Sequence, residues 1–237
     1  MQPEPPPSSV PRAPDHAPAP ANALEATRIV VVRHGETAWN AETRIQGHLD
    51  IALNATGEWQ AERLADALVG ETLTAAYTSD LRRAHRTAEA VAARHQLEVR
   101  TDRGLRERAF GAFEGMTWAE IHETRPEDAQ RWRQRDPVFT PGGTGESLIA
   151  FRERVLQTLD RIAAQHAGEQ ILLAAHGGVL DVLYRAATGQ ELDAPRTWKL
   201  GNAAINRLLW TPHGVTLVGW ADEAHLESPD GDDGTVG

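Results

Sequence analysis

Three short apolar runs constrain the fold of this chain more than any other feature of its sequence. They occupy residues 28–32, 73–77 and 171–175, and a helical pattern follows each of them along the chain. Short runs of this kind are typical of strands that are buried on both faces of a parallel sheet. Strands alternating with helices predict an α/β fold, a three-layer α/β/α sandwich with a mostly parallel central sheet.

The remaining elements are predicted from capping residues and shorter patterns. Asn54, Asp80 and Ser147 each precede a helical pattern. We expect them to cap these helices, because their side-chain oxygens accept hydrogen bonds from the first N–H groups of a helix. The pattern over residues 97–99 predicts a short strand, and that over residues 205–220 predicts a hairpin at the sheet edge. This hairpin is either a candidate edge for a homodimer or an edge that the protein itself covers.

The two ends of the chain differ in composition from the rest. The first 26 residues hold eight of the 14 prolines. Their few apolar residues do not offset the entropy of ordering, so residues 1–26 are expected to form a disordered leader. The leader lacks the basic start and apolar run of a secretory signal. A single domain is expected over residues 27–226, followed by a disordered acidic tail over residues 227–237.

Composition excludes several classes of protein. The chain has 24 basic and 34 acidic residues, a formal charge of −10 and no basic run, which argues against nucleic-acid binding. It has no cysteine, which excludes disulfides, a thiol nucleophile and thiolate metal sites. No apolar stretch reaches the roughly 18 residues of a membrane-spanning helix. We therefore expect a cytoplasmic protein without nucleic-acid or membrane partners.

Polar residues directly follow all three buried strands. Arg33 and His34 follow the first strand, the segment 79–84 follows the second, and His176 and Gly177 follow the third. In an open α/β sheet, ligands bind outside the carboxyl ends of the strands. The sequence therefore predicts that these residues converge if the strands are neighbours.

The residue types at these strand ends indicate phosphate chemistry. Arg33 and Arg83 offer planar donors that match phosphate oxygens. Glycines such as Gly177 let backbone N–H groups approach an anion near a helix N-terminus. Neighbouring arginines disfavour the imidazolium form, so we expect at least one of His34 and His176 to be neutral and nucleophilic. Positioned groups of this kind are sufficient for phosphoryl transfer.

Four sequence blocks carry a resemblance to a known family. They are Arg-His-Gly-Glu-Thr at 33–37, Ser-Asp-Leu-x-Arg-Ala-x-x-Thr-Ala at 79–88, Leu-x-Glu with Phe-Gly-x-Phe-Glu-Gly at 105–115, and Ala-His-Gly at 175–177. In this order they resemble the histidine phosphatase superfamily, which includes phosphoglycerate mutases and many small-molecule phosphatases. The resemblance extends over residues 28–226 and implies a phosphoglycerate mutase-like sandwich.

The resemblance implies a role for each catalytic candidate. His34 would be the nucleophile and carry a phosphohistidine intermediate. Arg33, Arg83 and His176 would clamp the phosphoryl oxygens. Glu107 would protonate the leaving oxygen and then activate water. No metal ion and no cofactor are expected.

Other positions match those that line the phosphate pocket in family members. They are Asn40, Gln46 and Gly47, and we expect Gly177 to contribute its backbone N–H group. Asn40 is alternatively a turn residue.

The segment between Glu107 and Glu146 indicates the branch of the family. Cofactor-dependent mutases carry a longer insertion here, with paired arginines that grip the substrate carboxylate, and this chain lacks that insertion. We therefore expect a phosphomonoesterase that acts on a small phosphorylated metabolite, with a bisphosphate-primed phosphoglycerate mutase as the alternative. Trp118, Trp132 and Phe139 are expected to form a lid over the substrate.

Other interpretations stay open from the residues alone. Two histidines and a carboxylate also form a metal triad, although the arginines would repel a divalent cation. A non-catalytic phosphate-binding module would use the same clamp. Arg83 is alternatively a helix residue paired with Glu89 or Asp80, and Glu36 and Glu114 are alternatives to Glu107.

Overall fold

The computed structural model describes residues 25–227, so nearly all of the predicted leader and tail lie outside the described residues. The described part of the chain forms one six-stranded sheet with the order β3-β2-β4-β1-β5-β6. Its strands are β1 (Thr27–Arg33), β2 (Ala75–Thr78), β3 (Val99–Thr101), β4 (Gln170–Ala175), β5 (Ile205–Thr211) and β6 (Gly214–Asp222).

The sheet is parallel on one side of β1 and antiparallel on the other. β4 pairs in parallel with β1 and β2, and β2 pairs in parallel with β3, whereas β5 runs antiparallel to β1 and β6. Arg33 faces Ala175 across the ladder of β1 and β4, and Thr78 faces Ala174 across that of β2 and β4. The carboxyl ends of β1, β2 and β4 therefore lie at the same edge, and the predicted mostly parallel sheet is confirmed.

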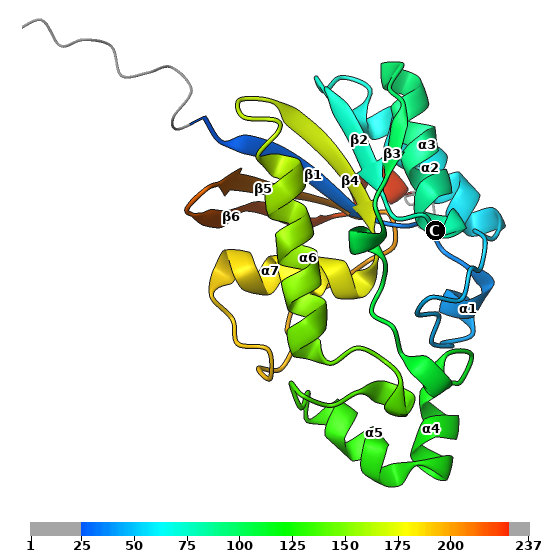
Figure 1. Cartoon of the computed structure of the whole chain (residues 1–237). Helices are drawn as coiled ribbons and strands as arrows, with labels where there is room; N and C mark the ends of the chain where they lie inside the picture. The colour runs from blue at the N-terminus through cyan, green and yellow to red at the C-terminus, as the bar shows by residue number, and fades with distance from the viewer. Residues whose placement is uncertain (1–24, 228–237) are drawn as a thin grey trace, which may run out of the picture.

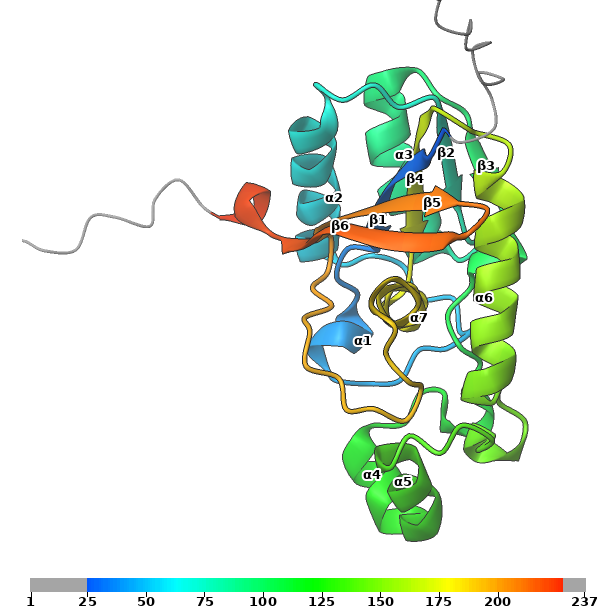
Figure 2. The same cartoon turned by 90° about the vertical axis from the view of Figure 1, so that its left-hand side faces the viewer.

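Two helices cover each face of the sheet (Figure 1 and Figure 2). The four outer helices are α2 (Ala55–Leu68), α3 (Arg82–His95), α6 (Leu148–Ala163) and α7 (Gly177–Thr188). Alternate strand residues point to opposite faces. Val30 and Val32 pack in the core under α2 and α3, whereas Ile29 and Val31 pack under α6 and α7. This is the predicted three-layer α/β/α sandwich.

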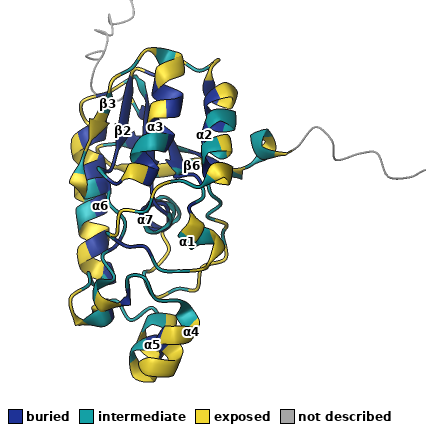
Figure 3. Ribbon diagram, turned by 90° about the vertical axis from the view of Figure 1, so that its right-hand side faces the viewer, coloured by how far each residue is buried: buried dark blue, intermediate teal, exposed yellow. Residues whose placement is uncertain are grey.

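A smaller helical part extends beyond the sandwich (Figure 1 and Figure 3). It has an apolar cluster of its own, in which Phe113 and Phe139 are buried beside Ile121 of α4. The short helices of the chain are α1 (Ala38–Ala41), α4 (Trp118–Thr124), α5 (Pro126–Arg133) and the 3₁₀ turns η1 (Arg103–Leu105), η2 (Gly111–Phe113), η3 (Pro141–Gly143) and η4 (Ala224–Leu226). Within residues 25–227 no helix is long and apolar enough to cross a membrane.

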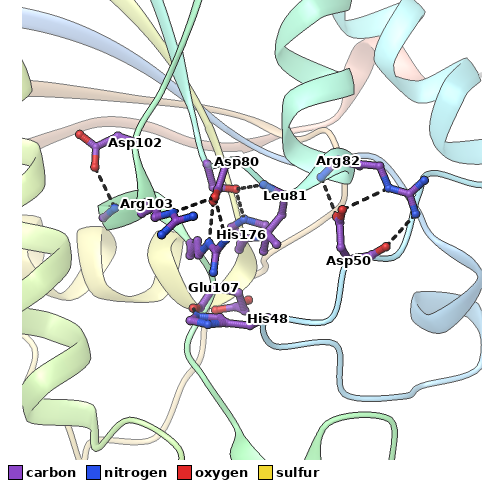
Figure 4. Close-up of polar contacts among 12 residues, drawn as sticks. His48, Asp50, Asp80, Leu81, Arg82, Asp102, Arg103, Glu107 and His176 are labelled. Atoms are coloured by element: carbon purple, nitrogen blue, oxygen red, sulfur yellow. Dashed lines mark hydrogen bonds and ion pairs between the residues drawn. The ribbon is translucent and has the colours of Figure 1, made fainter.

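Two of the three predicted helix caps are present. Asn54 caps α2 and Ser147 caps α6, each through its side-chain oxygen. The prediction for Asp80 is wrong, because Leu81 is the N-cap residue of α3 and makes no side-chain capping bond. Asp80 instead accepts hydrogen bonds from two guanidinium groups, one of them that of Arg103 (Figure 4). The other guanidinium is that of Arg106, which follows η1. Its hydrogen bonds are the main cause that lowers the pKa of Asp80 to about 2.

The predicted hairpin forms β5 and β6 at the end of the sheet order. Val218 on β6 is 58% exposed, whereas Trp210 on β5 is buried. β6 therefore presents an uncovered edge, and the homodimer stays a prediction.

Candidate active site

The candidate site lies where three parallel strands end. Arg33 is the last residue of β1 and His34 follows it, while His176 follows β4 and Ser79 follows β2. The backbone N–H of His34 donates to the carbonyl of Ala175 at 2.9 Å, which continues the β1–β4 ladder by one residue. The structure thereby brings the two predicted histidines together, with ring centroids 5.2 Å apart.

His34 is held with one ring nitrogen occupied. Its side chain is 2% exposed, and Nδ1 lies 2.7 Å from the carbonyl oxygen of Gly35. A carbonyl oxygen only accepts, so Nδ1 carries the proton and Nε2 of the neutral ring keeps its lone pair. Burial, followed by the charges of Arg83 and Arg33, holds the pKa of His34 well below its ordinary value. A lowered pKa favours the neutral ring, as expected from the sequence, and the nucleophilic role of His34 stays a prediction.

His176 is completely buried beside His34. Its Nε2 lies 2.7 Å from the hydroxyl oxygen of Ser79, and its Nδ1 has no hydrogen-bond partner among the described residues. Burial is the main cause that lowers its pKa well below the ordinary value, and the charge of Arg83 adds to it. The lowered pKa values favour uncharged imidazole rings at both histidines, beside the cationic side chains of Arg33 and Arg83.

The two predicted arginines are fixed by backbone carbonyls. Arg83 is fully buried and donates to the carbonyls of Gly47 and Leu49, both at 2.8 Å. Arg33 donates to the carbonyl of Leu200 at 2.6 Å. Burial lowers the pKa of Arg83 to about 10, so the group stays charged at neutral pH. The alternative pairing of Arg83 with Glu89 does not form. The carboxylate of Glu89 instead lies 3.3 Å from Nδ1 of His85.

Several buried polar atoms of this site lack a protein partner. They include Nε of Arg33, Nε of Arg83 and Nδ1 of His176, considered among the described residues. An arginine Nε–H is always a donor, and a buried donor without an acceptor costs about 1–3 kcal/mol. Oxygens of a phosphoryl group would supply the acceptors that these donors require.

Glu107 lies at the rim of this site. Its carboxylate accepts hydrogen bonds from the backbone N–H groups of Arg108 at 2.8 Å and of Gly178 at 3.1 Å, in the first turn of α7. Burial lowers the pKa of both Arg33 and Arg83, and the negative charge of Glu107 opposes that shift in each. The carboxylate is therefore within electrostatic range of both clamps.

The two alternative carboxylates have structural partners. Glu36 accepts a hydrogen bond from the side chain of Asn54 at 2.8 Å. Glu114 accepts from the backbone N–H of His48 at 3.1 Å and of Phe110 at 3.0 Å. Neither of these carboxylates lines the cavity beside the site, whereas Glu107 does.

The predicted phosphate-pocket residues have different surroundings. Asn40 accepts hydrogen bonds from Thr37 and completes the capping box of α1, which is the turn role given as its alternative. Gln46 is buried with Oε1 unpartnered among residues 25–227. Gly47 has φ +51°, which favours glycine, and Gly177 starts α7 next to the Arg33 guanidinium.

Two further residues contact the site but carry no distinctive sequence pattern. His48 donates from Nε2 to the carbonyl of Glu107 at 2.9 Å, and Figure 4 shows its ring beside that residue. Asn202 donates from Nδ2 to the carbonyl of His34 at 2.8 Å. Both lie in loops and bind backbone atoms that are distant in sequence. The sequence therefore gives no local pattern that predicts these contacts.

A cavity of about 710 Å³ opens beside Arg33, Glu107 and Gly177. Its apolar wall includes Phe110 and Trp132, whose rings stack 5.0 Å apart. Of the three residues predicted as a lid, Trp132 lines the cavity, whereas Trp118 and Phe139 do not line it and pack in the neighbouring apolar cluster. The described residues contain no group of three His, Asp or Glu side chains arranged to hold a metal ion.

Comparisons with known proteins agree with this geometry. A family model described as the histidine phosphatase superfamily (branch 1) matches residues 29–223. Phosphoglycerate mutase-like protein 4 of Arabidopsis thaliana is 43% identical over 208 residues, which cover 86% of this chain and 89% of the relative. The metal-independent phosphoserine phosphatase of the same plant is 38% identical over 207 residues, 86% of this chain and 85% of the relative.

A solved structure extends the likeness to three dimensions. Bacillus stearothermophilus YhfR superimposes with a TM-score of 0.78 at 32% identity, covering 85% of this chain and all of that protein. The family match spans β1 to β6 and all four sequence blocks. The chain therefore belongs to the histidine phosphatase superfamily, branch 1.

Proposed function

We propose that this protein hydrolyses a phosphate monoester of a small metabolite through a phosphohistidine on Nε2 of His34. The observation that carries the proposal is the unprotonated Nε2 of a buried, neutral His34, whose ring is fixed from the other side by the carbonyl of Gly35. The unpartnered donors of Arg33 and Arg83 support a phosphoryl group as the ligand.

In the first step Nε2 of His34 attacks phosphorus, and the N–P bond forms as the ester O–P bond breaks. Arg33, Arg83 and His176 balance the charge on the transferred oxygens. Glu107 in its protonated form gives its proton to the leaving oxygen. The products of this step are the free alcohol and phosphorylated His34, which keeps its Nδ1 hydrogen bond.

In the second step water replaces the alcohol. Glu107, now a carboxylate, accepts a proton from the water as its oxygen attacks phosphorus and the N–P bond breaks. Inorganic phosphate leaves, and His34 and Glu107 return to their starting protonation states. Gln46 and the N–H of Gly177 are proposed to bind phosphate oxygens, with Gly47 holding Arg83 through its carbonyl.

A mutase is the second candidate. The 43% identity to a relative named as phosphoglycerate mutase-like favours it. The phosphoryl group would then return to another hydroxyl of the bound phosphoglycerate in place of water. The short connection between Glu107 and Glu146, which lacks the mutase insertion, favours hydrolysis.

The test is release of phosphate from a panel of phosphorylated metabolites in the presence of a chelator, with isomerisation of 3-phosphoglycerate followed alongside. His34→Ala is expected to lower turnover about a thousand-fold or more, because the residual rate then lacks covalent catalysis. His85→Ala, on the outer side of α3, is the matched control and should retain activity. Labelled substrate should leave an acid-labile phosphoryl group on the wild-type protein and on His85→Ala, but not on His34→Ala. Undiminished turnover by His34→Ala would exclude the proposal.

The partners, location and oligomeric state of the protein are proposed and tested separately. The net charge of −10 argues against nucleic acid as a partner, and it requires any anion-binding surface to be local. A cytoplasmic location and a homodimer through the β6 edge are proposed, to be checked by fractionation and light scattering. A monomeric mass for the wild type, or a dimer that persists in Val218→Lys, would exclude a dimer through the β6 edge.

A further inference from the structure

The cavity extends well beyond the phosphate site. It is lined by Arg33 and Glu107 and also by Arg196 and Lys199, which lie in the loop between α7 and β5. Its volume of about 710 Å³ falls within the roughly 300–1,000 Å³ of pockets that hold a whole small molecule. The cavity is therefore large enough to hold the alcohol part of the ester beside the phosphoryl group.

The loop that carries these two cations is anchored at several points. Arg135 donates to the carbonyl of Leu192 at 2.7 Å, and Arg185 donates to the carbonyl of Ala194 at 2.9 Å. The ring of Trp198 stacks on a tyrosine of α7, with centroids 4.1 Å apart. Because the backbone and the aromatic ring are held, the loop presents its charged side chains from a pre-organised frame.

Arg196 and Lys199 have no ion-pair partner within the described part of the chain, and neither do Arg33 and Arg108, the cations beside the proposed phosphate site. Arg135, in contrast, binds Asp181 at 2.8 Å. Glu223 also lines the cavity, and its carboxylate lies against the backbone of Gly201.

Like charges approach one another here. Burial lowers the pKa of both Arg33 and Arg135, and the charge of Arg196 lowers each further. The cavity is lined by five cationic side chains, of Arg33, Arg108, Arg135, Arg196 and Lys199, and by three carboxylates, of Glu107, Asp181 and Glu223. This excess of positive charge favours an anionic ligand.

We infer that Arg196 and Lys199 form a second anion subsite, which binds a carboxylate or a second phosphate on the leaving group of the substrate. This inference rests on the proposed phosphatase function, since it assigns the part of the substrate that the phosphate clamp does not hold. It narrows the substrates to phosphomonoesters of hydroxy acids and to bisphosphates. Neutral sugar or alkyl esters fill the same volume without using the two cations.

The test compares two esters that share a carbon skeleton. 3-Phosphoglycerate carries a carboxylate where glycerol 3-phosphate carries a hydroxymethyl group. In the double variant Arg196→Gln, Lys199→Gln, kcat/KM for 3-phosphoglycerate should fall roughly 10- to 100-fold, the range for loss of charge-assisted hydrogen bonds. The value for glycerol 3-phosphate should change by less than about twofold. Arg152→Gln, exposed on α6 outside this cavity, is the control and should alter neither value.

Equal losses for both esters, or a wild-type protein that does not prefer the carboxylate, would overturn the subsite. Fructose 1,6-bisphosphate compared with fructose 6-phosphate distinguishes a second phosphate from a carboxylate as the bound anion. Titration calorimetry on the His34→Ala protein measures ligand affinity independently of turnover. Tighter binding of 3-phosphoglycerate than of glycerol 3-phosphate, lost in the double variant, supports the subsite even if no ester is hydrolysed. Equal binding of the two ligands, or none, counts against it.

Discussion

The imidazole of His48 donates from Nε2 to the carbonyl oxygen of Glu107 at 2.9 Å. The residues on either side of His48, Gly47 and Leu49, give their carbonyls to the guanidinium of Arg83. One short loop thus holds both Arg83, the proposed phosphate-binding cation, and Glu107, the proposed proton donor. A small displacement of this loop would misplace both groups, and catalytic rates depend steeply on such positions.

His48→Ala should lower kcat for alkyl phosphates about tenfold or more, because Glu107 loses a support and protonates the leaving oxygen less well. Turnover of 4-nitrophenyl phosphate should fall much less, since its leaving group departs without a proton. Steady-state kinetics on both substrates check the prediction. Equal losses on both substrates would indicate that His48 supports only the general fold of the loop.

Arg83→Lys should lower kcat/KM about 100-fold although the charge is kept. An ammonium group cannot bind the carbonyls of Gly47 and Leu49 and still direct a planar Nε–H into the site. Arg82→Lys is the matched control, because Arg82 points to Asp50 on the surface (Figure 4) and should retain full activity. Comparable losses in the two variants would contradict the assignment of Arg83 to the clamp.

Stability should fall as the solution becomes acidic. Burial, and then the charges of nearby arginines, hold the pKa of His34 and of His176 well below the ordinary 6.5. Below about pH 6.5 the unfolded chain binds protons at these positions and the folded protein does not. The free energy of unfolding should therefore decrease between about pH 7 and 5, by up to about 1.4 kcal/mol per pH unit for each group. Urea unfolding at several pH values measures this slope.

A substitution tests whether the buried histidines cause this pH dependence of the free energy of unfolding. His176→Gln removes one titrating group, so its stability should depend less on pH than that of the wild type. A slope unchanged by His176→Gln would show that the pKa of His176 is close to that of the unfolded chain. His213→Gln, on the exposed turn between β5 and β6, serves as the control.

Gly57→Ala should destabilise the protein by about 1–3 kcal/mol. Alanine usually stabilises a helix over glycine, but a Cβ at Gly57 would overlap the backbone carbonyl of Glu36. Gly70→Ala is the control, since no atom lies within 4 Å of its new Cβ. Thermal unfolding should show a lowered midpoint for Gly57→Ala alone; an unchanged midpoint would contradict the close approach of α2 to the loop after β1.

The sequence was most informative where local pattern and tertiary environment agree. The apolar runs predicted β1, β2 and β4, because strands buried on both faces leave a continuous apolar signal. The rule that ligands bind at the carboxyl edge of such a sheet then predicted that Arg33, His34 and His176 lie together. The same logic placed α2 and α6 behind Asn54 and Ser147.

Features that depend on distant parts of the chain were less predictable. Asp80 resembled a helix cap, but guanidinium groups from residues 103 and 106 bind its carboxylate more strongly than free N–H groups would. Glu107 was separated from Glu36 only when the fold gave Glu36 a structural partner. Asn202 binds a carbonyl 168 residues away, and no local pattern encodes such a contact.

The reversed direction of β5 has a consequence for how substrates are exchanged over evolutionary time. Because β5 runs antiparallel to β1, it begins at the phosphate edge, where the N–H of Ala203 donates to the carbonyl of Arg33 at 3.0 Å. The loop over residues 189–204 therefore reaches the cavity from a strand that is not part of the β2-β4-β1 ladder. Insertions or substitutions in this loop can remodel what the cavity admits while the register beneath the two histidines stays intact. A lineage can thereby acquire new substrates without rebuilding its phosphate chemistry.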